Sequence, residues 1–491
     1  MRKSKTFCAT AHSNLQIQLM TKPLPHDFIQ QMTSLIGNAE AQQLFDAIQQ
    51  TAPATSIRRN AAKTVCSAAK LFDNQKATPV PWCTEGAYLN ERPSFILDPV
   101  LHGGGYYVQE AASMFLEQAV RKILSDTTPQ RVLDLCAAPG GKSTLWRSLL
   151  PEGTLLVANE PMRQRADILA ENMLKWGNPD VVVTNAFPNE FQGLNSFFEV
   201  IGADVPCSGE GMFRKDDVAI SEWFSQNVLE CVERQWQIVC DIWDCLREGG
   251  YMVYSTCTFN RMENEDMVRR ICTELGAEVV TLPVEAAWNV HTLNPEGKVI
   301  NAAEANNGMY HFYPHKSKGE GLFLCLLRKT SEAPLMKQKK GKPSGSDKVQ
   351  IPAEVRHALS WLQAPQDFQV MLHNATEWTA VRQSLAADIT LLQKQVRCLT
   401  AGIPLAESKG KKLVPLHGLA LSTQLCPDAF PRCEVELQTA LAYLHREAIQ
   451  VEAPTGWTLV CYKGLPLGFV NNLGNRANNQ YPQAWRIRRS I

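Results

Sequence analysis

The sequence lacks the paired cysteine motifs that mark disulfide frameworks and zinc sites. Its 491 residues include 15 cysteines, an odd number, and no two of them are spaced as Cys-x-x-Cys. We therefore expect neither a disulfide-stapled fold nor a metal site. Free thiols are typical of a reducing compartment, so the protein is expected to be cytoplasmic.

Long hydrophobic runs are also missing. No apolar run comes near the roughly 18 residues that a membrane-spanning helix needs, so we expect no membrane partner. The N-terminus carries Arg2, Lys3 and Lys5, but no uninterrupted apolar stretch follows them, which argues against a secretory signal. Met20 precedes the first helical pattern, and residues 1–19 are expected to be an over-extended start or a disordered segment.

The whole chain has no net charge, but its two parts carry opposite net charges. The 49 basic residues balance the 49 acidic ones. Residues 331–491 carry 19 Lys and Arg against 12 Asp and Glu, a balance of +7, so residues 1–330 have a balance of −7. A basic C-terminal third predicts an appendage that binds a polyanion.

The middle of the chain alternates between strand and helix patterns. Strands are expected over residues 131–136, 153–160, 181–185, 197–204, 251–255, 277–282 and 322–327. Helices are expected over residues 25–50, 109–124, 161–176 and 264–275, and from residue 141 onward. Strands separated by helices of this length are typical of βαβ units, so the predicted fold class is α/β with a mainly parallel, doubly wound sheet.

A linker divides this region from the basic end. Residues 337–346 are polar, basic and free of apolar side chains, so residues 331–350 are predicted to be a linker. Beyond it the patterns predict two small α+β units, residues 351–398 and residues 399–491. We find no internal repeat.

Two cysteines lie just past the ends of apolar runs. Cys207 is part of DVPCSGEG at residues 204–211, and Cys257 is part of YSTCT at residues 254–258. In open α/β sheets, ligands and chemistry collect beyond the carboxyl ends of the strands, so both thiols should face one cleft. A cysteine is more often a small buried hydrophobe, but two such placements beside Ser, Thr or Asp favour a chemical role.

A glycine-rich turn, DLCAAPGGKS at residues 134–143, follows the first expected strand of the sheet and opens a helix. Its glycines allow a ligand close to the backbone, and the helix N-terminus favours an anionic group. The turn has neither the GxGxxG nor the Walker spacing. Glu160 ends the next strand, where an acidic side chain can bind the hydroxyls of a ribose. Together they predict an adenosine-bearing ligand.

These motifs resemble the Sun-type family of RNA (cytosine-5) methyltransferases. DLCAAPGGKS, then PCSGEGMFRK, then YSTCTF followed by Asn-Glu-Asp at residues 264–266, stand in the family's order. YVQEAAS at residues 107–113 is similar to the motif that precedes the family's methyl-donor domain. The resemblance covers about residues 20–330. Residues 467–482 resemble the PUA-like end of the RsmF-type rRNA branch.

The resemblance implies a domain organisation and a cofactor. It implies a Rossmann-like methyltransferase domain over residues 101–330, an RNA-binding module at residues 20–100, and a PUA-like RNA-binding module at residues 399–491. S-adenosyl-L-methionine would be the cofactor. The residues that would hold it are Cys136, Ala137, Ala138, Pro139, Gly140, Gly141, Lys142, Glu160, Arg165, Asn185 and Asp204.

The chemistry of the family explains why these residue types are needed. Cytosine C5 is a weak nucleophile until a thiolate adds to C6, and sulfur both attacks and leaves well. A carboxyl beside N3 would offset the charge that develops on the ring. A base must then remove the C5 proton. By resemblance, Cys257 is the nucleophile, Cys207 assists release, Asp204 contacts the base edge and Lys142 lies in the same cleft.

Two positions depart from the family's pattern. Asn185 stands where the family often has an Asp that meets the adenine, and we expect its side-chain amide to make that contact. Val205 stands where Ala is usual, and its branched side chain is expected to tighten the loop.

Several alternatives stay open. DNA cytosine-5 methyltransferases attack with the cysteine of a Pro-Cys motif, which would make Cys207 the nucleophile, but the Glu-Asn-Val run that should follow is absent. The enzyme could instead act on tRNA, because the catalytic motifs do not distinguish RNA substrates. A non-catalytic ribosome-assembly factor is a further alternative, and the presence together of Asp204, Cys207, Cys257 and Glu160 argues against it.

We therefore predict a monomeric, S-adenosyl-L-methionine-dependent enzyme that methylates cytosine C5 in rRNA through a covalent bond to C6. Small-subunit 16S rRNA is the expected substrate. The basic end is expected to grip RNA phosphates through the linker lysines and through Arg476, Arg486, Arg488 and Arg489. Because the cofactor motifs lie in the acidic part, cofactor binding is expected to be independent of the basic end.

Overall fold

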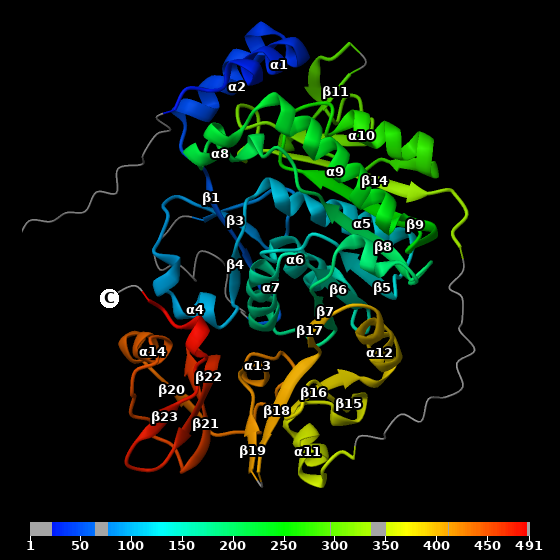
Figure 1. The fold of residues 1–491 in the computed structure, drawn as a ribbon. Helices are drawn as coiled ribbons and strands as arrows, with labels where there is room; N and C mark the ends of the chain where they lie inside the picture. Colours follow the sequence, from blue (N-terminus) through cyan, green and yellow to red (C-terminus); the bar gives the residue numbers. More distant parts are fainter. Residues whose placement is uncertain (1–21, 64–76, 295, 335–349, 411, 489–491) are drawn as a thin grey trace, which may run out of the picture.

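The computed structural model describes residues 22–63, 77–294, 296–334, 350–410 and 412–488. Residues 1–19 and most of the expected linker, residues 335–349, lie outside the described residues. Helices α1 (His26–Ile36) and α2 (Asn38–Gln50) lie at one end of the molecule, and the two C-terminal sheets lie at the opposite end (Figure 1). Among the described residues, no helix is both long and apolar enough to cross a membrane.

The central sheet confirms the predicted α/β class. Its described strands run in the order β12-β11-β13-β14-β9-β8-β5-β6-β7-β17, and β10 pairs with β14. Strands β5 to β9 pair in parallel, and their bounds are β5 (Arg131–Asp134), β6 (Leu155–Asn159), β7 (Val181–Thr184), β8 (Phe198–Asp204) and β9 (Leu246–Thr256). The antiparallel strands beyond β9 are β10 (Ala277–Val280), β11 (His291–Leu293), β12 (Val299–Asn301), β13 (Met309–Phe312) and β14 (Leu322–Lys329). Successive strands extend the sheet one way from β5 to β7 and the other way from β8 to β9, so the strand order switches between β5 and β8. Ligands bind at this switch point in such folds.

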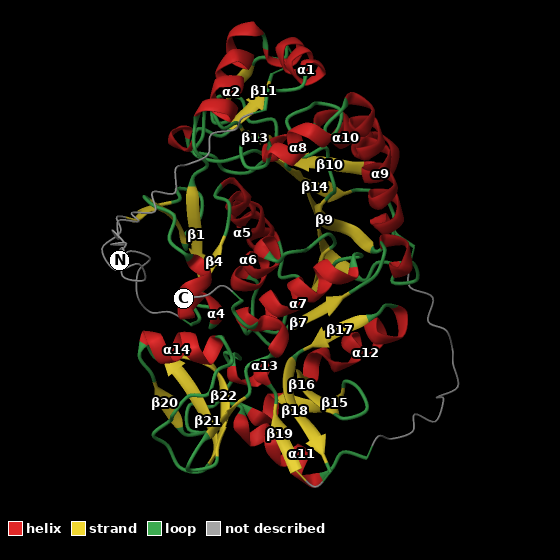
Figure 2. Cartoon of the chain, turned by 60° about the vertical axis from the view of Figure 1, so that its left-hand side comes forward, coloured by secondary structure: helices red, strands yellow, loops and turns green. Residues whose placement is uncertain are grey.

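Helices cover both faces of this sheet, and alternate strand residues point to each (Figure 2). One face carries α5 (Leu116–Asp126), α6 (Gly141–Leu149) and α7 (Arg163–Trp176). The other carries α9 (Ser225–Trp243) and α10 (Glu265–Arg270).

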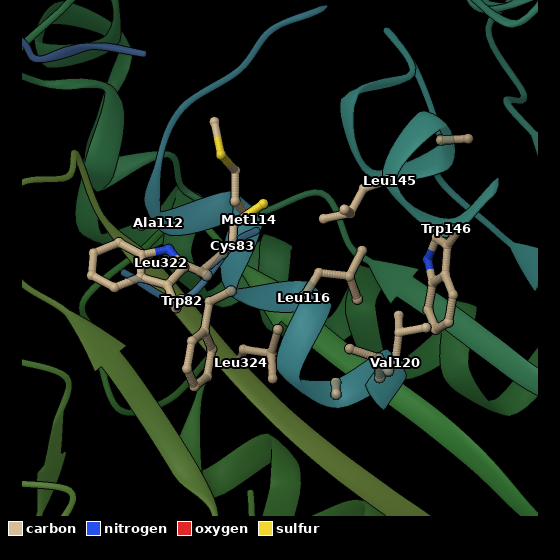
Figure 3. Close-up of a cluster of buried hydrophobic side chains, with 14 of the residues drawn as sticks. Trp82, Cys83, Ala112, Met114, Leu116, Val120, Leu145, Trp146, Leu322 and Leu324 are labelled. Carbon is tan, nitrogen blue, oxygen red and sulfur yellow. The ribbon is translucent and has the colours of Figure 1, made fainter. Parts of the chain in front are cut away.

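The first of these faces also buries part of the N-terminal region. Trp82 and Cys83 pack with residues of α5, α6 and β14 in one buried apolar cluster, as Figure 3 shows. The N-terminal sheet has the order β2-β3-β1-β4, with bounds β2 (Ala77–Pro79), β3 (Gly86–Leu89), β1 (Thr55–Arg59) and β4 (Tyr106–Val108). This sheet therefore extends past the expected boundary at residue 100.

Two helices differ from the sequence patterns. The helical pattern over residues 25–50 forms two helices rather than one, because Gly37 between them has φ +84°, which an α-helix cannot accommodate. The pattern over residues 264–275 forms α10 and then a π-helical turn, Ile271–Gly276.

The C-terminal third forms two small sheets. The first is β15 (Phe368–Leu372), β16 (Glu377–Arg382), β18 (Ile403–Lys409) and β19 (Lys412–Pro415). The second is β20 (Arg432–Glu434), β21 (Gly456–Tyr462), β22 (Leu465–Asn472) and β23 (Ala477–Asn479). Since β16 pairs with β18, the expected boundary between residues 398 and 399 falls inside the first sheet.

Strand β17 argues against the expectation that cofactor binding is independent of the basic end. This strand (Cys398–Ala401) pairs antiparallel with β7 and forms an edge of the central sheet. The preceding helix α12 (Ala386–Gln395) contributes Ile389 and Leu392 to the core of that sheet. Arg382 also forms a buried ion pair with Asp180, at 2.8 Å, beside β7. The catalytic sheet is therefore completed by residues from beyond the linker.

Truncation after residue 330 should consequently lower the melting temperature and the affinity for S-adenosyl-L-methionine together. The cut removes β17 and α12, so it exposes the edge of β7 and part of the core. A truncation after residue 428, which keeps β17 and removes the last sheet, is the matched control and should retain cofactor affinity. Calorimetry and thermal melts measure both, and unchanged affinity after the longer truncation, at residue 330, would contradict this account.

Candidate active site

The two cysteines meet at the carboxyl edge of the central sheet. Strands β8 and β9 are parallel neighbours, paired so that Asp204 lies opposite Ser255. The loops that follow bring the Sγ atoms of Cys207 and Cys257 to 3.3 Å from each other. The backbone N–H of Cys257 also donates to the sulfur of Cys207, at 3.4 Å. The two thiols thus lie side by side at one edge of the sheet, where their positions after two apolar runs predict them.

The protonation of Cys207 depends on its partner. Its hydrogen bond with Cys257, followed by burial, raises the pKa of the Cys207 thiol well above its usual range. The raised pKa favours the protonated thiol at Cys207, and either sulfur can donate the hydrogen bond between them. Burial, followed by the charges of Asp204 and Glu160, raises the pKa of a third thiol in the region, Cys136.

A lysine–carboxylate pair lies at the same edge of the sheet. Lys142 Nζ is 2.8 Å from Asp204 Oδ2, and the Ser255 hydroxyl donates to Asp204 Oδ1 at 2.7 Å. Burial alone would lower the pKa of Lys142, but the charge and the hydrogen bond of Asp204 outweigh it and the pKa is raised. Lys142 is thus a fixed cation that holds the Asp204 carboxylate in one orientation.

A buried polar network supports the two loops that carry Cys207 and Cys257. Glu263 accepts the Ser208 N–H at 3.0 Å, the Gln235 side chain at 2.6 Å and the Asn260 side chain at 2.6 Å. Gln235 also donates to the Pro206 carbonyl at 2.9 Å. Burial raises the pKa of Glu263. The sequence patterns did not identify these residues, because a buried Glu or Gln has no local signature that separates it from an exposed one.

The glycine-rich turn connects β5 to α6 in the arrangement that an anionic or ribose-bearing ligand needs. Gly140 adopts φ +117°, in the left-handed region. The first hydrogen bond within the helix runs from the Thr144 N–H to the Gly140 carbonyl. The N–H groups that precede Thr144 in the first turn therefore have no partner within the helix and can bind a ligand. Burial raises the pKa of Asp134 to about 7, and the Ser143 hydroxyl donates to this side chain at 2.6 Å.

The acidic side chain after β6 is held firmly. Glu160 is buried and accepts the Met162 N–H at 3.0 Å, and Arg165 Nη2 lies 3.5 Å from its other oxygen. Arg165 also donates to the Ala138 carbonyl in the glycine-rich turn, at 3.0 Å. The structure thus brings together three of the residues assigned to cofactor binding.

The two positions that depart from the family's pattern have structural roles. The side-chain nitrogen of Asn185 donates to the carbonyls of Glu160 and Pro161, at 2.9 and 2.8 Å. Its backbone N–H donates to the carbonyl of Arg397, next to β17. Val205 is buried in the core beneath the loop, so the two carbons that it has beyond Ala fill apolar space.

Comparison with known proteins gives the family. Residues 121–328 match the 16S rRNA methyltransferase RsmB/F family, residues 24–111 match the N-terminal domain of 16S rRNA methyltransferase RsmF, and residues 430–487 match the methyltransferase RsmF PUA domain. Ribosomal RNA small subunit methyltransferase F of Salmonella agona is 31% identical over 420 residues, which cover 83% of this chain and 84% of the relative. The same-named protein of Aliivibrio fischeri is 30% identical over 484 residues, covering 94% and 97%. The chain belongs to the RsmF family of rRNA methyltransferases.

Two solved structures share the fold. A methyltransferase homolog from Pyrococcus horikoshii, at 24% identity and TM-score 0.51, covers 62% of this chain and 94% of that one. NSun6 from the same organism, with SFG, has 18% identity and TM-score 0.51 and covers 63% and 99%. The predicted family, the Rossmann-like methyltransferase fold and the use of S-adenosyl-L-methionine are confirmed for this RsmF-family member.

The residues present fit that cofactor. Open N–H groups at the start of α6 suit its carboxylate end, and the buried Glu160 suits its ribose hydroxyls. The bound cofactor supplies an electrophilic methyl group, and Gly140, Gly141, Glu160 and Asn185 are the residues that would hold it beside the two sulfurs.

Replacing Glu160 with Ala should weaken binding of S-adenosyl-L-methionine by about 1–3 kcal/mol, the scale of a hydrogen bond to a charged group. Asp167→Ala is the matched control, because it removes an exposed carboxylate from the first turns of the following helix α7, where Asp167 pairs with Arg163 at 3.1 Å. Isothermal titration calorimetry measures both. Equal affinity of the Glu160 variant and the native protein would remove Glu160 from the ribose site.

Proposed function

We propose that this RsmF-family enzyme methylates C5 of a cytosine in 16S rRNA, with Cys257 as the nucleophile and Cys207 as the group that allows product release. The observation that carries the proposal is the 3.3 Å contact between the two sulfurs. If one sulfur donates the shared hydrogen bond, the other receives it and is the better placed nucleophile.

The first step uses Cys257 and Asp204. The Cys257 sulfur adds to C6 of the cytosine, which makes C5 electron-rich and able to accept the methyl group. Asp204, positioned by Lys142 and Ser255, would accept from the exocyclic amine and, in its protonated form, donate its proton to N3, which neutralises the negative charge that develops on the ring. The carboxylate needs no reorientation for this, because both its oxygens are already held.

The second step depends on a change in the acidity of Cys207. The leading cause of its raised pKa is the hydrogen bond with Cys257, to which the charge of Cys257 adds. Both causes end once the Cys257 sulfur is bonded to C6. The pKa of Cys207 then falls, and its thiolate can take the C5 proton while the C6–sulfur bond breaks. The base therefore becomes available at the step that needs it.

The rRNA substrate is supported by the family and by the domain matches at both ends of the chain. Arg476, Arg486 and Arg488 are exposed in the last unit, where they can contact phosphates. Arg489 and the linker lysines lie outside the described residues. Action on rRNA in turn supports location in the cytoplasm, where ribosomal subunits of bacterial relatives assemble.

Replacing each of the two cysteines by Ala should give opposite results. Cys257→Ala should abolish methylation and form no covalent complex, because the nucleophile is missing. Cys207→Ala should trap RNA on the protein as an adduct that survives denaturation, because the C5 proton stays in place. Incubation with S-adenosyl-L-methionine and RNA, followed by denaturing electrophoresis, measures the adduct.

Cys325→Ala serves as the control, since this buried cysteine on β14 lies outside the cleft and should leave adduct formation unchanged. A trapped adduct in Cys257→Ala instead would reverse the two roles and favour the mechanism of DNA cytosine-5 methyltransferases.

Deletion of the gene should remove a bisulfite-resistant cytosine from 16S rRNA and leave tRNA cytosines unchanged. Bisulfite sequencing of total RNA from the deletion strain, compared with the strain complemented by the native gene, measures this. Loss of the signal from tRNA alone would show that the enzyme acts on tRNA.

A further inference from the structure

A buried carboxylate, Glu210, ties the two cysteine loops together. Its side chain is 0% exposed. Its Oε2 accepts the backbone N–H groups of Phe259 and Asn260, at 2.8 and 3.0 Å. Its Oε1 accepts from the side chains of Asn260, at 3.2 Å, and Gln31, at 2.9 Å. Every contact comes from a donor, so the position needs a group that only accepts hydrogen bonds.

These hydrogen bonds join the loops close to the sulfurs. Glu210 follows Cys207 in one loop, and Phe259 follows Cys257 in the other. Between them, the Gly211 N–H donates to the Cys257 carbonyl at 2.7 Å, and a Cβ added to Gly211 would lie 2.6 Å from that oxygen. The loops are already in close contact, so a shift at Glu210 moves Cys257 relative to Cys207.

Helix α1 supports this junction from the N-terminal region. Gln31 lies on α1, and Phe28 and Met32 of the same helix pack in one apolar cluster with Phe213 and Phe259. Phe213 belongs to the loop of Cys207 and Phe259 to the loop of Cys257, so one helix contacts both. The rings of Phe28 and Phe213 lie 5.0 Å apart, edge to face.

We propose that Glu210 is a positioning residue for methyl transfer: its carboxylate, held by Gln31 of α1, sets the separation of the two cysteine sulfurs. The proposal rests on the two-cysteine mechanism above. This role differs from a purely stabilising one, because Glu210 binds the backbone N–H groups of Phe259 and Asn260, which follow the nucleophile Cys257 in the chain. Misplacement of reacting groups by about 1 Å can cost around 100-fold in rate.

The test replaces Glu210 with Gln in the full-length enzyme. The new amide places a donor where the carboxylate accepted, so at least one of the four hydrogen bonds is lost. We expect kcat to fall roughly tenfold to 100-fold, while the dissociation constant for S-adenosyl-L-methionine changes less than about twofold. Since Cys207 would no longer face the bonded base, the fraction of enzyme in the denaturation-resistant adduct should rise above that of the native protein.

Glu199→Gln is the matched control. Glu199 is also a buried carboxylate near β8, and it accepts the backbone N–H groups of Gln130 and Arg131, at 3.2 and 2.7 Å, but at the opposite end of the strand. This variant should lose thermal stability and keep native kcat and adduct levels. A second variant, Gln31→Glu combined with Glu210→Gln, exchanges donor and acceptor and should recover part of the lost kcat.

The outcomes separate the two proposals. Native kcat and adduct levels in Glu210→Gln, or a loss of kcat that Glu199→Gln shares in proportion to its melting temperature, would overturn the positioning role alone. Failure of the native enzyme itself to form an adduct with Cys257 would overturn the two-cysteine mechanism, and the positioning role with it. A selective fall in kcat with adduct accumulation supports both.

Discussion

The parallel pairing of β8 with β9 is the constraint on which the rest of the site depends. The register that sets Asp204 opposite Ser255 makes both loops begin at the same height, so two sulfurs far apart in the chain come within 3.3 Å. A slip of the register would turn the side chains to the opposite face and separate the thiols. Strand pairing does not determine the course of the loops after the strands end. The hydrogen bonds of the buried Glu263 and Glu210 fix that course.

The Lys142–Asp204 pair and the sulfur pair have different roles in the site. Lys142 neutralises Asp204 and orients it, while the two sulfurs are joined by a hydrogen bond. The pKa of Cys207 is governed by its neighbour rather than by a distant charge, so the acidity of one thiol responds to the bonding of the other.

The features that the sequence predicts best are those encoded locally. The strands β5 to β8, the start of α6 after Gly140 and the end of α7 at Gly177 follow from apolar runs and from glycines at fixed offsets. The position of both thiols at one edge follows in the same way. The motif residues are thus found because each is adjacent to an element with a clear pattern.

The features that the sequence does not reveal depend on contacts between distant segments. Nothing in the short pattern of β17 indicates that it pairs with β7, because an edge strand is specified by the partner that it meets in the folded chain. Glu210 likewise has the pattern of an exposed acidic residue, and its burial follows only from the donors that α1 and the second loop bring to it. The division between the N-terminal and catalytic regions is blurred for the same reason, since Trp82 completes the core of the catalytic sheet.

The measurement that tests the central claim most directly is the site of attachment on the native enzyme. RNA containing 5-fluorocytosine carries a C5 substituent that a base cannot remove as a proton, so release should stop after methyl transfer. Proteolysis and mass spectrometry of the trapped complex then identify the bonded residue. The account predicts attachment to Cys257, with Cys207 unmodified. Attachment to Cys207 would contradict it.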